Sequence, residues 1–466
     1  MSEIKLLIAA SEALPFAATG GLADVIGSLP PALSKIGIDV RVVIPLYSSI
    51  SAENRAKMTF VKAINVKLAW RNQHCGIFMA EHNNVKFYFI DNEYYFKRAS
   101  MYGDSDDGER YAFFCKAVLE MLPHIEFFPD IIHSNDWHTA LIPVYLKRLY
   151  NKTPGYSGIK SIHTLHNIEY QGEFSFDLLE DVFELSQKEH MLMDYKGKVN
   201  LTKGAVICCD KFTTVSPTYA EEIKTEMYSH GLHYILNMYL GKITGILNGI
   251  DTDYYKPVNF SADDLSGKYE EKAALQLEQG LPVNPDTPMI SMITRLVVHK
   301  GMDLVVHVIE ELLEQEDVQF VLLGTGEQKY EDFFKHIAGK YPDKVKAIIS
   351  FDSDLAKRLY SASDIFLMPS KSEPCGLAQM ISSQYGTVPF VREVGGLYDS
   401  IKDMENGFTF SNFNAHDMLF KLKFILAMYK NDKTAWNALV NRVMAVDFSW
   451  SVSAEKYKNL YKELIN

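Results

Sequence analysis

The stretch Lys5-Leu6-Leu7-Ile8-Ala9 decides the fold of the first half of this chain, because it has the length and apolarity of a buried strand. A helical pattern follows over residues 22–35, and a second β-branched run covers residues 40–44 and is closed by Pro45. Strands that alternate with helices predict a parallel sheet with helices on both faces. Further strands are expected at residues 85–90, 131–134, 161–165 and 211–215.

The second half restarts the same alternation, with apolar runs at residues 289–293, 318–323, 345–349, 365–368 and 388–391. These runs predict a second doubly wound α/β domain. Residues 245–251 are interpreted as a hinge, and residues 254–288, rich in Asp, Pro, Lys and Glu, as a connecting segment without a clear strand. We expect domains over residues 1–245 and 246–445.

The last segment of the chain has an apolar helical face, formed by Tyr457, Leu460, Tyr461 and Leu464. This face needs a partner surface.

Composition narrows the classes of function. A length of 466 residues predicts two or three domains at roughly 100 to 200 residues each, and 47% hydrophobic with 23% charged residues is typical of a soluble globular protein. The net charge of −12 argues against general affinity for nucleic acid or for an anionic membrane, which depends on clustered Lys and Arg. An anionic ligand must therefore bind in a local basic pocket.

The cysteines and the N-terminus indicate the compartment. The five cysteines are odd in number and lack metal-site spacing, so neither a disulfide framework nor a structural zinc is expected at Cys75, Cys115, Cys208, Cys209 and Cys375. No apolar run approaches the ~20 residues that span a bilayer, and the N-terminal run is too short for a signal peptide. We expect reduced thiols and a cytoplasmic protein.

Two cations follow the first predicted strand of the second half, in Thr294-Arg295-Leu296-Val297-Val298-His299-Lys300-Gly301. A diphosphate leaving group gathers negative charge as its bond to a sugar breaks, and fixed cations stabilise that charge. Arginine supplies a planar fork and lysine a mobile point charge. Taken alone, the pair would also fit an ordinary solvated surface.

Three further turns follow predicted strands in this half. Gly324 and Gly326 leave bare backbone that could approach a ligand, although the spacing is not that of a dinucleotide motif. Glu373 could hold sugar hydroxyls, or it could cap the helix that follows it, and both interpretations remain open at this point. The same stretch continues as Pro374-Cys375-Gly376-Leu377, and Gly395-Gly396 forms another bare turn.

In the first half, Asn135-Asp136-Trp137-His138 and His166-Asn167 both end predicted strands, so their polar side chains are expected to converge on one crevice. Four histidines suggest a metal, but no H-E-x-x-H or similar spacing supports one, and hydrogen-bonding roles are favoured for His133, His138, His163 and His166. A P-loop and a G-x-S-x-G elbow are both missing from the sequence, and glycosidase carboxylate pairs cannot be recognised by spacing.

Taken together, these stretches resemble the bacterial glycogen synthases and plant starch synthases, which are glucan synthases that use nucleotide-activated glucose. The resemblance covers essentially the whole chain. The matching stretches are Ser11-Glu12-Ala13-Leu14-Pro15-Phe16, Thr19-Gly20-Gly21-Leu22-Ala23-Asp24-Val25, Asp136-Trp137-His138-Thr139-Ala140, His166-Asn167-Ile168-Glu169-Tyr170-Gln171-Gly172, Val215-Ser216-Pro217-Thr218-Tyr219, Leu247-Asn248-Gly249-Ile250-Asp251, Arg295, Lys300-Gly301, Glu373-Pro374-Cys375-Gly376-Leu377 and Asp447-Phe448-Ser449-Trp450.

The resemblance implies a GT-B fold, in which two Rossmann-like domains face each other across a deep cleft. It implies that the donor binds mainly to the second domain and the glucan acceptor mainly to the first, and that a final helix over about residues 446–466 returns to the first domain. It further implies a retaining transfer of glucose from ADP-glucose to the nonreducing 4-hydroxyl of an α-1,4-glucan. No metal ion or other cofactor is implied.

The resemblance also assigns roles to residues. Arg295 and Lys300 would neutralise the departing diphosphate, and Glu373 would orient the glucosyl group. His166 and Asp136 would line the sugar pocket. Asn248 would contact the donor sugar near the hinge, Asp24 and the Gly20-Gly21 turn would close over the donor, and Phe351 would stack on the nucleotide base. The other substrate contacts expected are Thr19, His138, Asn167, Gly324, Gly326, Cys375, Gly376 and Leu377.

The chain departs from the family pattern at a few positions. Ala18 replaces a lysine expected near the donor phosphates, and such a charge-assisted contact is worth on the order of 1.5 to 3 kcal/mol. Phe351 keeps a ring but not a tyrosine hydroxyl, and His299 stands where glutamine is common. Two alternatives therefore stay open: a synthase that uses UDP-glucose or both donors, and an inactive glucan-binding homologue. The sequence predicts no oligomeric state.

Overall fold

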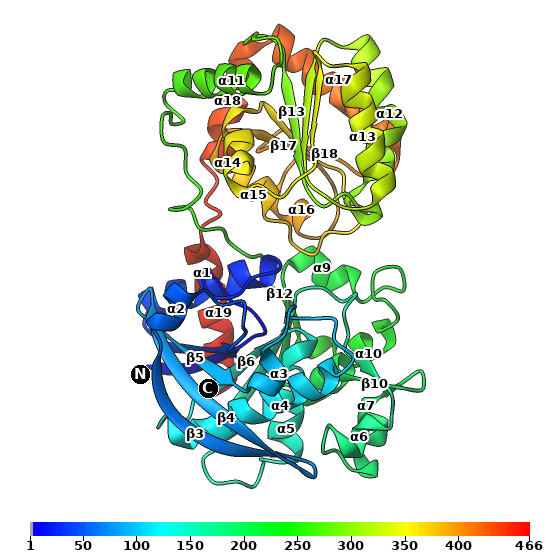
Figure 1. Cartoon of the computed structure of the whole chain (residues 1–466). Helices are drawn as coiled ribbons and strands as arrows, with labels where there is room; N and C mark the ends of the chain where they lie inside the picture. The colour runs from blue at the N-terminus through cyan, green and yellow to red at the C-terminus, as the bar shows by residue number, and fades with distance from the viewer. Residues whose placement is uncertain (1–2) are drawn as a thin grey trace. The chain divides into compact units, whose positions relative to one another are not determined.

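The computed structural model describes residues 3–466, which form two compact units (Figure 1). Unit 1 runs to Gly249 and also includes Trp450–Asn466, whereas unit 2 comprises Ile250–Ser449. The domain boundaries expected from the sequence lie slightly earlier, at residues 245 and 445.

Unit 1 is built on a nine-stranded sheet in the order β12-β11-β7-β6-β1-β2-β5-β4-β3. The strands from β12 through β5 are parallel to their neighbours, and β4 and β3 extend one edge as antiparallel strands. Their bounds are β1 Ile4–Ala9, β2 Ile38–Pro45, β3 Thr59–Leu68, β4 Arg71–His82, β5 Val85–Asp91, β6 Ile131–Asn135, β7 Lys160–Leu165, β11 Lys211–Thr214 and β12 Ile243–Gly245. The central strand β1 is buried except at Lys5, as its apolar run requires.

The helices of unit 1 pack around this sheet in one hydrophobic core. Their bounds are α1 Gly21–Lys35, α2 Ala52–Ala56, α3 Glu93–Phe96, α4 Asp107–Met121, α5 Leu141–Arg148, α6 Leu178–Asp181, α7 His190–Met193, α8 Leu201–Cys208, α9 Pro217–Glu222, α10 His233–Met238 and α19 Trp450–Ile465. A small three-stranded sheet, in the order β8-β10-β9, is formed by Glu173–Phe174, Lys198–Asn200 and Asp194–Tyr195.

Unit 2 has a six-stranded parallel sheet in the order β15-β14-β13-β16-β17-β18. Its strands are β13 Met289–Ile293, β14 Gln319–Leu323, β15 Val345–Ile348, β16 Ile365–Met368, β17 Val388–Arg392 and β18 Phe408–Phe410. Its helices are α11 Ser266–Glu278, α12 Met302–Gln315, α13 Gln328–Lys340, α14 Ser353–Ala362, α15 Ala378–Gln384, α16 Gly395–Ser400, α17 Ala415–Asn431 and α18 Lys433–Met444.

Both units have the strand order of the Rossmann fold. Counted within unit 2, the order is 3-2-1-4-5-6, and in unit 1 the strands β2 and β5 lie to one side of β1 while β6, β7 and β11 lie to the other. Such sheets bind ligands beyond the carboxyl ends of their strands, at the switch point where the order reverses. The switch point lies between β13 and β16 in unit 2 and between β1 and β6 in unit 1. The doubly wound α/β fold predicted from the sequence is confirmed.

All the strands expected from the sequence form, but the pattern missed several elements. The outer strand β3 is largely exposed, so it carries little of the apolar signal that marks a strand, and β12 and β18 are only three residues long. The segment interpreted as a connection contains helix α11, which the composition did not indicate.

Helix α19 is the last element of the chain and belongs to unit 1. Tyr457, Leu460 and Tyr461 are buried in the core of that unit, and Leu464 packs against it. The Tyr461 hydroxyl lies 2.9 Å from His133 Nδ1, on the central strand β6. The core of unit 1 is therefore the partner surface that the apolar stripe of this helix requires.

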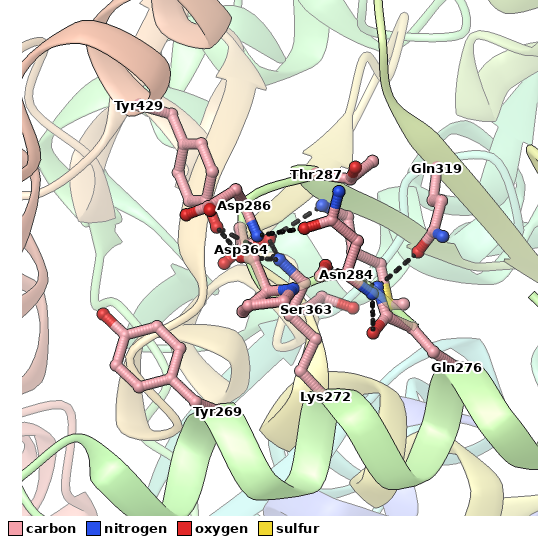
Figure 2. A network of polar contacts seen from close by, with 12 residues as sticks. Tyr269, Lys272, Gln276, Asn284, Asp286, Thr287, Gln319, Ser363, Asp364 and Tyr429 are labelled. Carbon is pink, nitrogen blue, oxygen red and sulfur yellow. Dashed lines mark hydrogen bonds and ion pairs between the residues drawn. The ribbon is translucent and has the colours of Figure 1, made fainter. Parts of the chain in front are cut away.

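A buried polar network fastens α11 to the amino ends of the unit 2 strands (Figure 2). Lys272 Nζ lies 2.7 Å from Asp364 Oδ2, and the same carboxylate oxygen accepts the Met289 backbone N–H at 2.7 Å, where β13 begins. Gln276 Nε2 donates to Gln319 Oε1 at 2.8 Å, where β14 begins. These contacts hold the edge of the sheet opposite to the switch point, which leaves the carboxyl edge available for ligands.

Candidate active site

Two loops meet at the switch point of unit 2. The loop after β13 carries Arg295 and Lys300, and the loop after β16 carries Glu373. Because β13 and β16 are adjacent and parallel, their carboxyl ends bring these loops together. Lys300 Nζ lies 2.6 Å from Glu373 Oε2, although the two residues are 73 positions apart. The structure therefore places two of the predicted catalytic residues in direct contact.

Glu373 is held by its neighbours rather than by the following helix. Its side chain is 8% exposed, and Ser370 Oγ also donates to Oε2 at 3.0 Å. Helix α15 begins at Ala378 with Leu377 at its N-cap, and no side chain caps it. The helix-capping interpretation of Glu373 is therefore wrong, and the carboxylate instead forms a charge pair with Lys300.

Arg392, at the end of β17, positions the loop that carries Glu373. Its Nε donates to the Ser370 carbonyl at 2.8 Å and its NH2 group to the Lys371 carbonyl at 2.7 Å. The guanidinium also lies over the Phe413 ring, and the side chain is buried. The sequence analysis missed this residue, whose only signal is a charged residue that ends an otherwise apolar strand.

Gly324 and Gly326 allow two backbones to approach closely. A Cβ atom at Gly324 would lie 1.8 Å from the Thr294 carbonyl oxygen, and one at Gly326 would lie 2.2 Å from the Leu296 carbonyl oxygen. The Leu296 N–H donates to the Thr325 carbonyl at 2.9 Å across the same contact. These glycines therefore fix the path of the loop that carries Arg295. Their own N–H groups already donate to other groups of unit 2, Gly324 to the Ile348 carbonyl at 3.1 Å and Gly326 to Glu331 Oε1 at 3.0 Å.

The stretch after Glu373 is a tight turn. Gly376 has φ 71°, in the left-handed region that glycine adopts without strain. Gln379 Nε2 donates to the carbonyls of Cys375 at 3.2 Å and Gly376 at 2.9 Å, so the turn is tied to α15. Cys375 is buried, and Leu377 is partly exposed.

A pocket of about 290 Å³ opens beside this site in unit 2. Arg295, Gly324 and Phe351 line it, together with Tyr254 and Lys357. Within residues 3–466 the Arg295 guanidinium makes no ion pair or hydrogen bond, and Phe351 is 94% exposed. A cation without a counter-ion, beside a ring with an open face, suits a phosphorylated ligand that also carries a base.

The switch point of unit 1 is acidic. Glu12, in the loop after β1, accepts the Thr19 backbone N–H at 2.5 Å and the Thr19 hydroxyl at 2.9 Å, both at Oε2. Burial raises the pKa of Glu12 to about 7, and the two Thr19 contacts oppose that rise. This carboxyl holds the Thr19-Gly20-Gly21 turn, a role that the sequence analysis did not assign to it.

Asp136 has a strained backbone at the end of β6. Its φ of 56° and ψ of 176° lie in a region that is essentially reserved for glycine. Its Oδ1 accepts the His166 backbone N–H at 2.7 Å, which joins the loops after β6 and β7, and the Asn167 N–H also contacts the carboxylate. Burial raises the pKa of Asp136 to about 7, against these hydrogen bonds.

His166 is positioned as a neutral hydrogen-bonding group. Its Nε2 lies 3.0 Å from Asn135 Oδ1, and burial lowers its pKa to about 3. Because an amide oxygen only accepts, Nε2 carries the proton and Nδ1 presents a lone pair. His166 can therefore accept a hydroxyl hydrogen bond, but it does not serve as an acid near neutral pH.

His138 lies in a box of aromatic rings. Its ring centroid is 4.0 Å from Trp137, 4.5 Å from Tyr102 and 4.6 Å from Tyr111. Burial, followed by the charge of Arg110, lowers its pKa to about 3. Its Nδ1 atom is buried and has no hydrogen-bond partner among residues 3–466.

The remaining predicted residues of unit 1 lie at the ends of elements. Gly20 and Gly21 start helix α1 without a side-chain cap, and no heavy atom lies within 4 Å of a Cβ built at either position. Asp24 follows in the first turn, and burial raises its pKa to about 6. Asn248, beyond β12, is buried, and its Oδ1 atom has no partner in the described chain.

The other two histidines make hydrogen bonds inside the sheet. His133 Nε2 lies 2.5 Å from Thr164 Oγ1, and His163 Nδ1 lies 2.8 Å from Ser134 Oγ. Among residues 3–466, one group of acidic, cysteine or histidine side chains is close enough to share an ion, and it contains Asp104, Asp106 and Asp107. Arg98 and Arg110 already form ion pairs with this group.

Comparisons with known proteins identify the class. A family model described as the starch synthase catalytic domain matches residues 5–238, and one described as glycosyl transferases group 1 matches residues 276–438. With two Rossmann-like units, the chain is a glycosyltransferase with the GT-B fold. In the part of the chain that the structure describes, no helix is both long and apolar enough to cross a membrane.

The particular family follows from full-length relatives. The chain is 47% identical to glycogen synthases of Bacillus cereus and Bacillus anthracis over 99% of its length and 100% of theirs. It matches the solved catalytic domain of starch synthase IV from Arabidopsis thaliana, bound to ADP and acarbose, with a TM-score of 0.91, 34% identity and full coverage of both chains. The chain belongs to the glycogen and starch synthase family. A sucrose-phosphate synthase from Thermosynechococcus elongatus, 17% identical with a TM-score of 0.63 and 99% coverage of both chains, shares the fold.

Proposed function

We propose that this protein is a glucan synthase that transfers glucose, with retention, from ADP-glucose to the nonreducing end of an α-1,4-glucan. The observation that carries the proposal is the 2.6 Å contact between Lys300 and Glu373 at the unit 2 switch point, beside a pocket that contains the unpaired Arg295. The ADP bound to the similar starch synthase IV supports the adenine nucleotide.

In this proposal unit 2 handles the leaving group. Negative charge develops on the diphosphate as the glucosyl bond breaks, and the Arg295 and Lys300 cations stabilise it. Glu373, fixed by Lys300 and Ser370, accepts hydrogen bonds from glucosyl hydroxyls. Phe351 packs on the base. Gly324, Gly326 and the turn Cys375-Gly376-Leu377 shape the surrounding backbone.

Unit 1 supplies sugar contacts in the same proposal. The Asp136 carboxyl and the neutral His166 ring offer acceptors to hydroxyl groups, and Asn248 offers its unpaired amide oxygen. Thr19, Gly20, Gly21 and Asp24 contact the donor, and His138 and Asn167 support the sugar pocket. No step in this scheme uses a metal ion. The reaction is assigned to the cytoplasm, since none of the five cysteines, all of which lie in the described chain, forms a disulfide.

Ala18 supports a second candidate, in which the donor is UDP-glucose or either nucleotide sugar. The lysine that the family carries beside the glycine turn would bind donor phosphates, and its loss changes the balance of contacts on the nucleotide. The reaction on the glucan would be the same.

The test is a donor competition. Purified protein is incubated with glycogen and either ADP-glucose or UDP-glucose, and release of each nucleoside diphosphate is measured over a range of donor concentrations, with and without EDTA. We expect preferential ADP release that EDTA leaves unchanged. A Michaelis constant that is lower for UDP-glucose than for ADP-glucose would show that UDP-glucose is the preferred donor. No release from either donor would identify the chain as an inactive glucan-binding homologue.

A further inference from the structure

An exposed tryptophan stands at the tip of the β3–β4 hairpin of unit 1. Trp70 is 76% exposed, and Tyr94, on the short helix α3, is 65% exposed. Single exposed apolar residues are common on proteins and need no explanation by themselves. Trp70 and Tyr94 differ from such single residues, because a network of buried and ion-paired groups beneath them supports both rings.

The indole of Trp70 is fixed at its edge and on one face. Its Nε1–H donates to Asp181 Oδ1 at 2.7 Å, and the Arg71 guanidinium carbon lies 4.4 Å from the ring centroid. Arg71 is itself 9% exposed and pairs with Asp181 Oδ2 and Glu109 Oε2, both at 3.0 Å. The ring therefore loses its rotational freedom while most of its area stays open to solvent.

The backbone beneath Trp70 is also fixed. Ala69 has φ 52°, in the left-handed region that is unfavourable for a residue with a Cβ atom. Its N–H donates to Glu184 Oε2 at 3.3 Å, and Glu184 pairs with Lys116 at 2.6 Å. The hairpin tip is therefore anchored to the body of unit 1.

Tyr94 shares this support. The Tyr95 hydroxyl donates to Glu109 Oε1 at 2.6 Å, so the carboxylate that binds Arg71 also fixes the residue next to Tyr94. The Tyr94 ring lies edge-on to Tyr95, with centroids 5.1 Å apart, and Arg98 Nε donates to the Tyr94 carbonyl at 3.1 Å. One ionic network therefore presents two aromatic rings on the same unit.

From this arrangement we propose that Trp70 and Tyr94 form a holding site for an α-1,4-glucan chain on unit 1, in addition to the site that catalyses transfer; the proposal rests on the glucan synthase function. A pyranose ring has an apolar C–H face that packs on an aromatic ring, and hydroxyls at its rim that bind carboxylates. Asp181 has an exposed carboxylate, 51% accessible, beside the indole. The site supplies both kinds of contact.

The size and setting of the surface favour a sugar over a protein partner. A stable protein interface buries about 800 Å² on each side around an apolar centre. Here two rings are surrounded by ion-paired side chains, and the next exposed apolar residues of the hairpin, Phe60 and Val61, lie at the other end of β3, about 30 Å away at ~3.3 Å per residue. Two separate rings on a charged surface match a saccharide chain.

The experiment compares a polymeric with a short acceptor. Trp70→Ala and Tyr94→Ala should each raise the Michaelis constant for glycogen about five- to tenfold, leaving the constant for maltotetraose and both turnover numbers within twofold. Trp70→Phe, which keeps a ring, should give a smaller rise. Phe420→Ala on α17, a ring that is 78% exposed, is the matched control and should change neither constant.

Affinity electrophoresis in glycogen-containing gels reads the site without turnover, so the result is independent of the proposed reaction. Reduced retardation of Trp70→Ala and Tyr94→Ala, with wild-type circular dichroism, is the expected outcome. The proposal would be overturned by unchanged retardation, or by Michaelis constants that rise equally for glycogen and maltotetraose. A change in the oligomeric mass measured by sedimentation would also overturn it. The last result would assign the rings to contact with a second copy of the chain.

Discussion

The two switch points of this molecule share a topology and differ in charge. In unit 1 the loops beyond β1 and β6 bring carboxyls together, and burial raises the pKa values of Glu12 and Asp136 to about 7. In unit 2 the loop after β13 carries Arg295 and Lys300, and the carboxylate of Glu373, in the loop after β16, is paired with Lys300. The sheet therefore determines where a ligand can bind, while the loop residues determine the charge of each site, which in the proposed function suits a diphosphate in unit 2 and sugar hydroxyl groups in unit 1.

Removing Lys300 should have the largest effect on this contrast. We expect Lys300→Ala to lower the turnover number about 10²- to 10³-fold, because the cation that the proposed function assigns to the leaving group is lost. The change also leaves Glu373 buried without its partner, which destabilises unit 2. Release of ADP from ADP-glucose and the midpoint of thermal unfolding are the two measurements.

A double variant separates these effects. Lys300→Ala with Glu373→Gln removes the unpaired charge, so stability should recover while turnover stays low. Recovery of turnover together with stability would show that the pair only holds the fold. Lys340→Ala, in an exposed ion pair with Glu310, is the control.

The acidic switch point should be visible in the pH dependence of stability. Burial raises the pKa of Glu12 from 4.5 to about 7, so the folded protein holds this proton more tightly than the unfolded chain. The stabilisation from this proton is fully present below pH 4.5 and is lost as the pH rises through 7, a change of about 3 kcal/mol.

Glu12→Gln keeps an acceptor for Thr19 and removes the titration. The free energy of unfolding, measured with urea, should therefore decline between pH 5 and pH 8 by about 3 kcal/mol less in this variant than in the wild type. Glu81→Gln, at an exposed carboxylate, should leave the wild-type slope unchanged. An unchanged slope in Glu12→Gln would mean that this carboxyl is ionised in the folded protein at neutral pH.

Placing a cation in unit 1 should reduce the difference in charge between the two switch points. Ala18 is exposed and precedes the turn that Glu12 holds, so Ala18→Lys should lower the Michaelis constant for ADP-glucose about tenfold. Ala18→Met adds length without charge and should have no such effect. Equal constants for the lysine variant and the wild type would show that another group already binds the phosphates.

The smallest expected effect is on binding of the nucleotide base of the donor. Phe351→Ala should raise the Michaelis constant for ADP-glucose about three- to tenfold without loss of stability, because the ring is 94% exposed. Phe351→Leu keeps apolar area and should recover only part of the affinity. A loss of thermal stability in Phe351→Ala would instead give the ring a packing role.

The sequence predicted the sheets well for a physical reason. β13 and β16 were predicted with the bounds that the structure has, since they are continuous apolar runs buried in a parallel sheet. β3 was missed because its residues face solvent along most of its length. Helix α11 was missed because its buried residues include Lys268, Lys272 and Gln276, which carry no apolar periodicity.

The candidate site was predictable only as a set of residues. Resemblance to the family nominated Lys300 and Glu373, but their contact depends on the adjacency of β13 and β16, which no local pattern encodes. The roles of Arg392 and Glu12 were not predicted because both side chains bind backbone groups. Arg392 donates to the Ser370 carbonyl, and Glu12 accepts the Thr19 N–H. A residue type does not reveal that its partner is a peptide group.

Helix α19 has a consequence for how the chain is made. Unit 1 needs the last helix to cover its core, where Tyr461 contacts His133 and Ser453 Oγ donates to the Leu247 carbonyl. About 200 residues separate Gly249 from Trp450, and at ~5–20 residues per second their synthesis takes roughly 10–40 s. On the ribosome, the unit that is begun first is therefore completed last, and the part of its core that α19 covers lacks that cover during the interval.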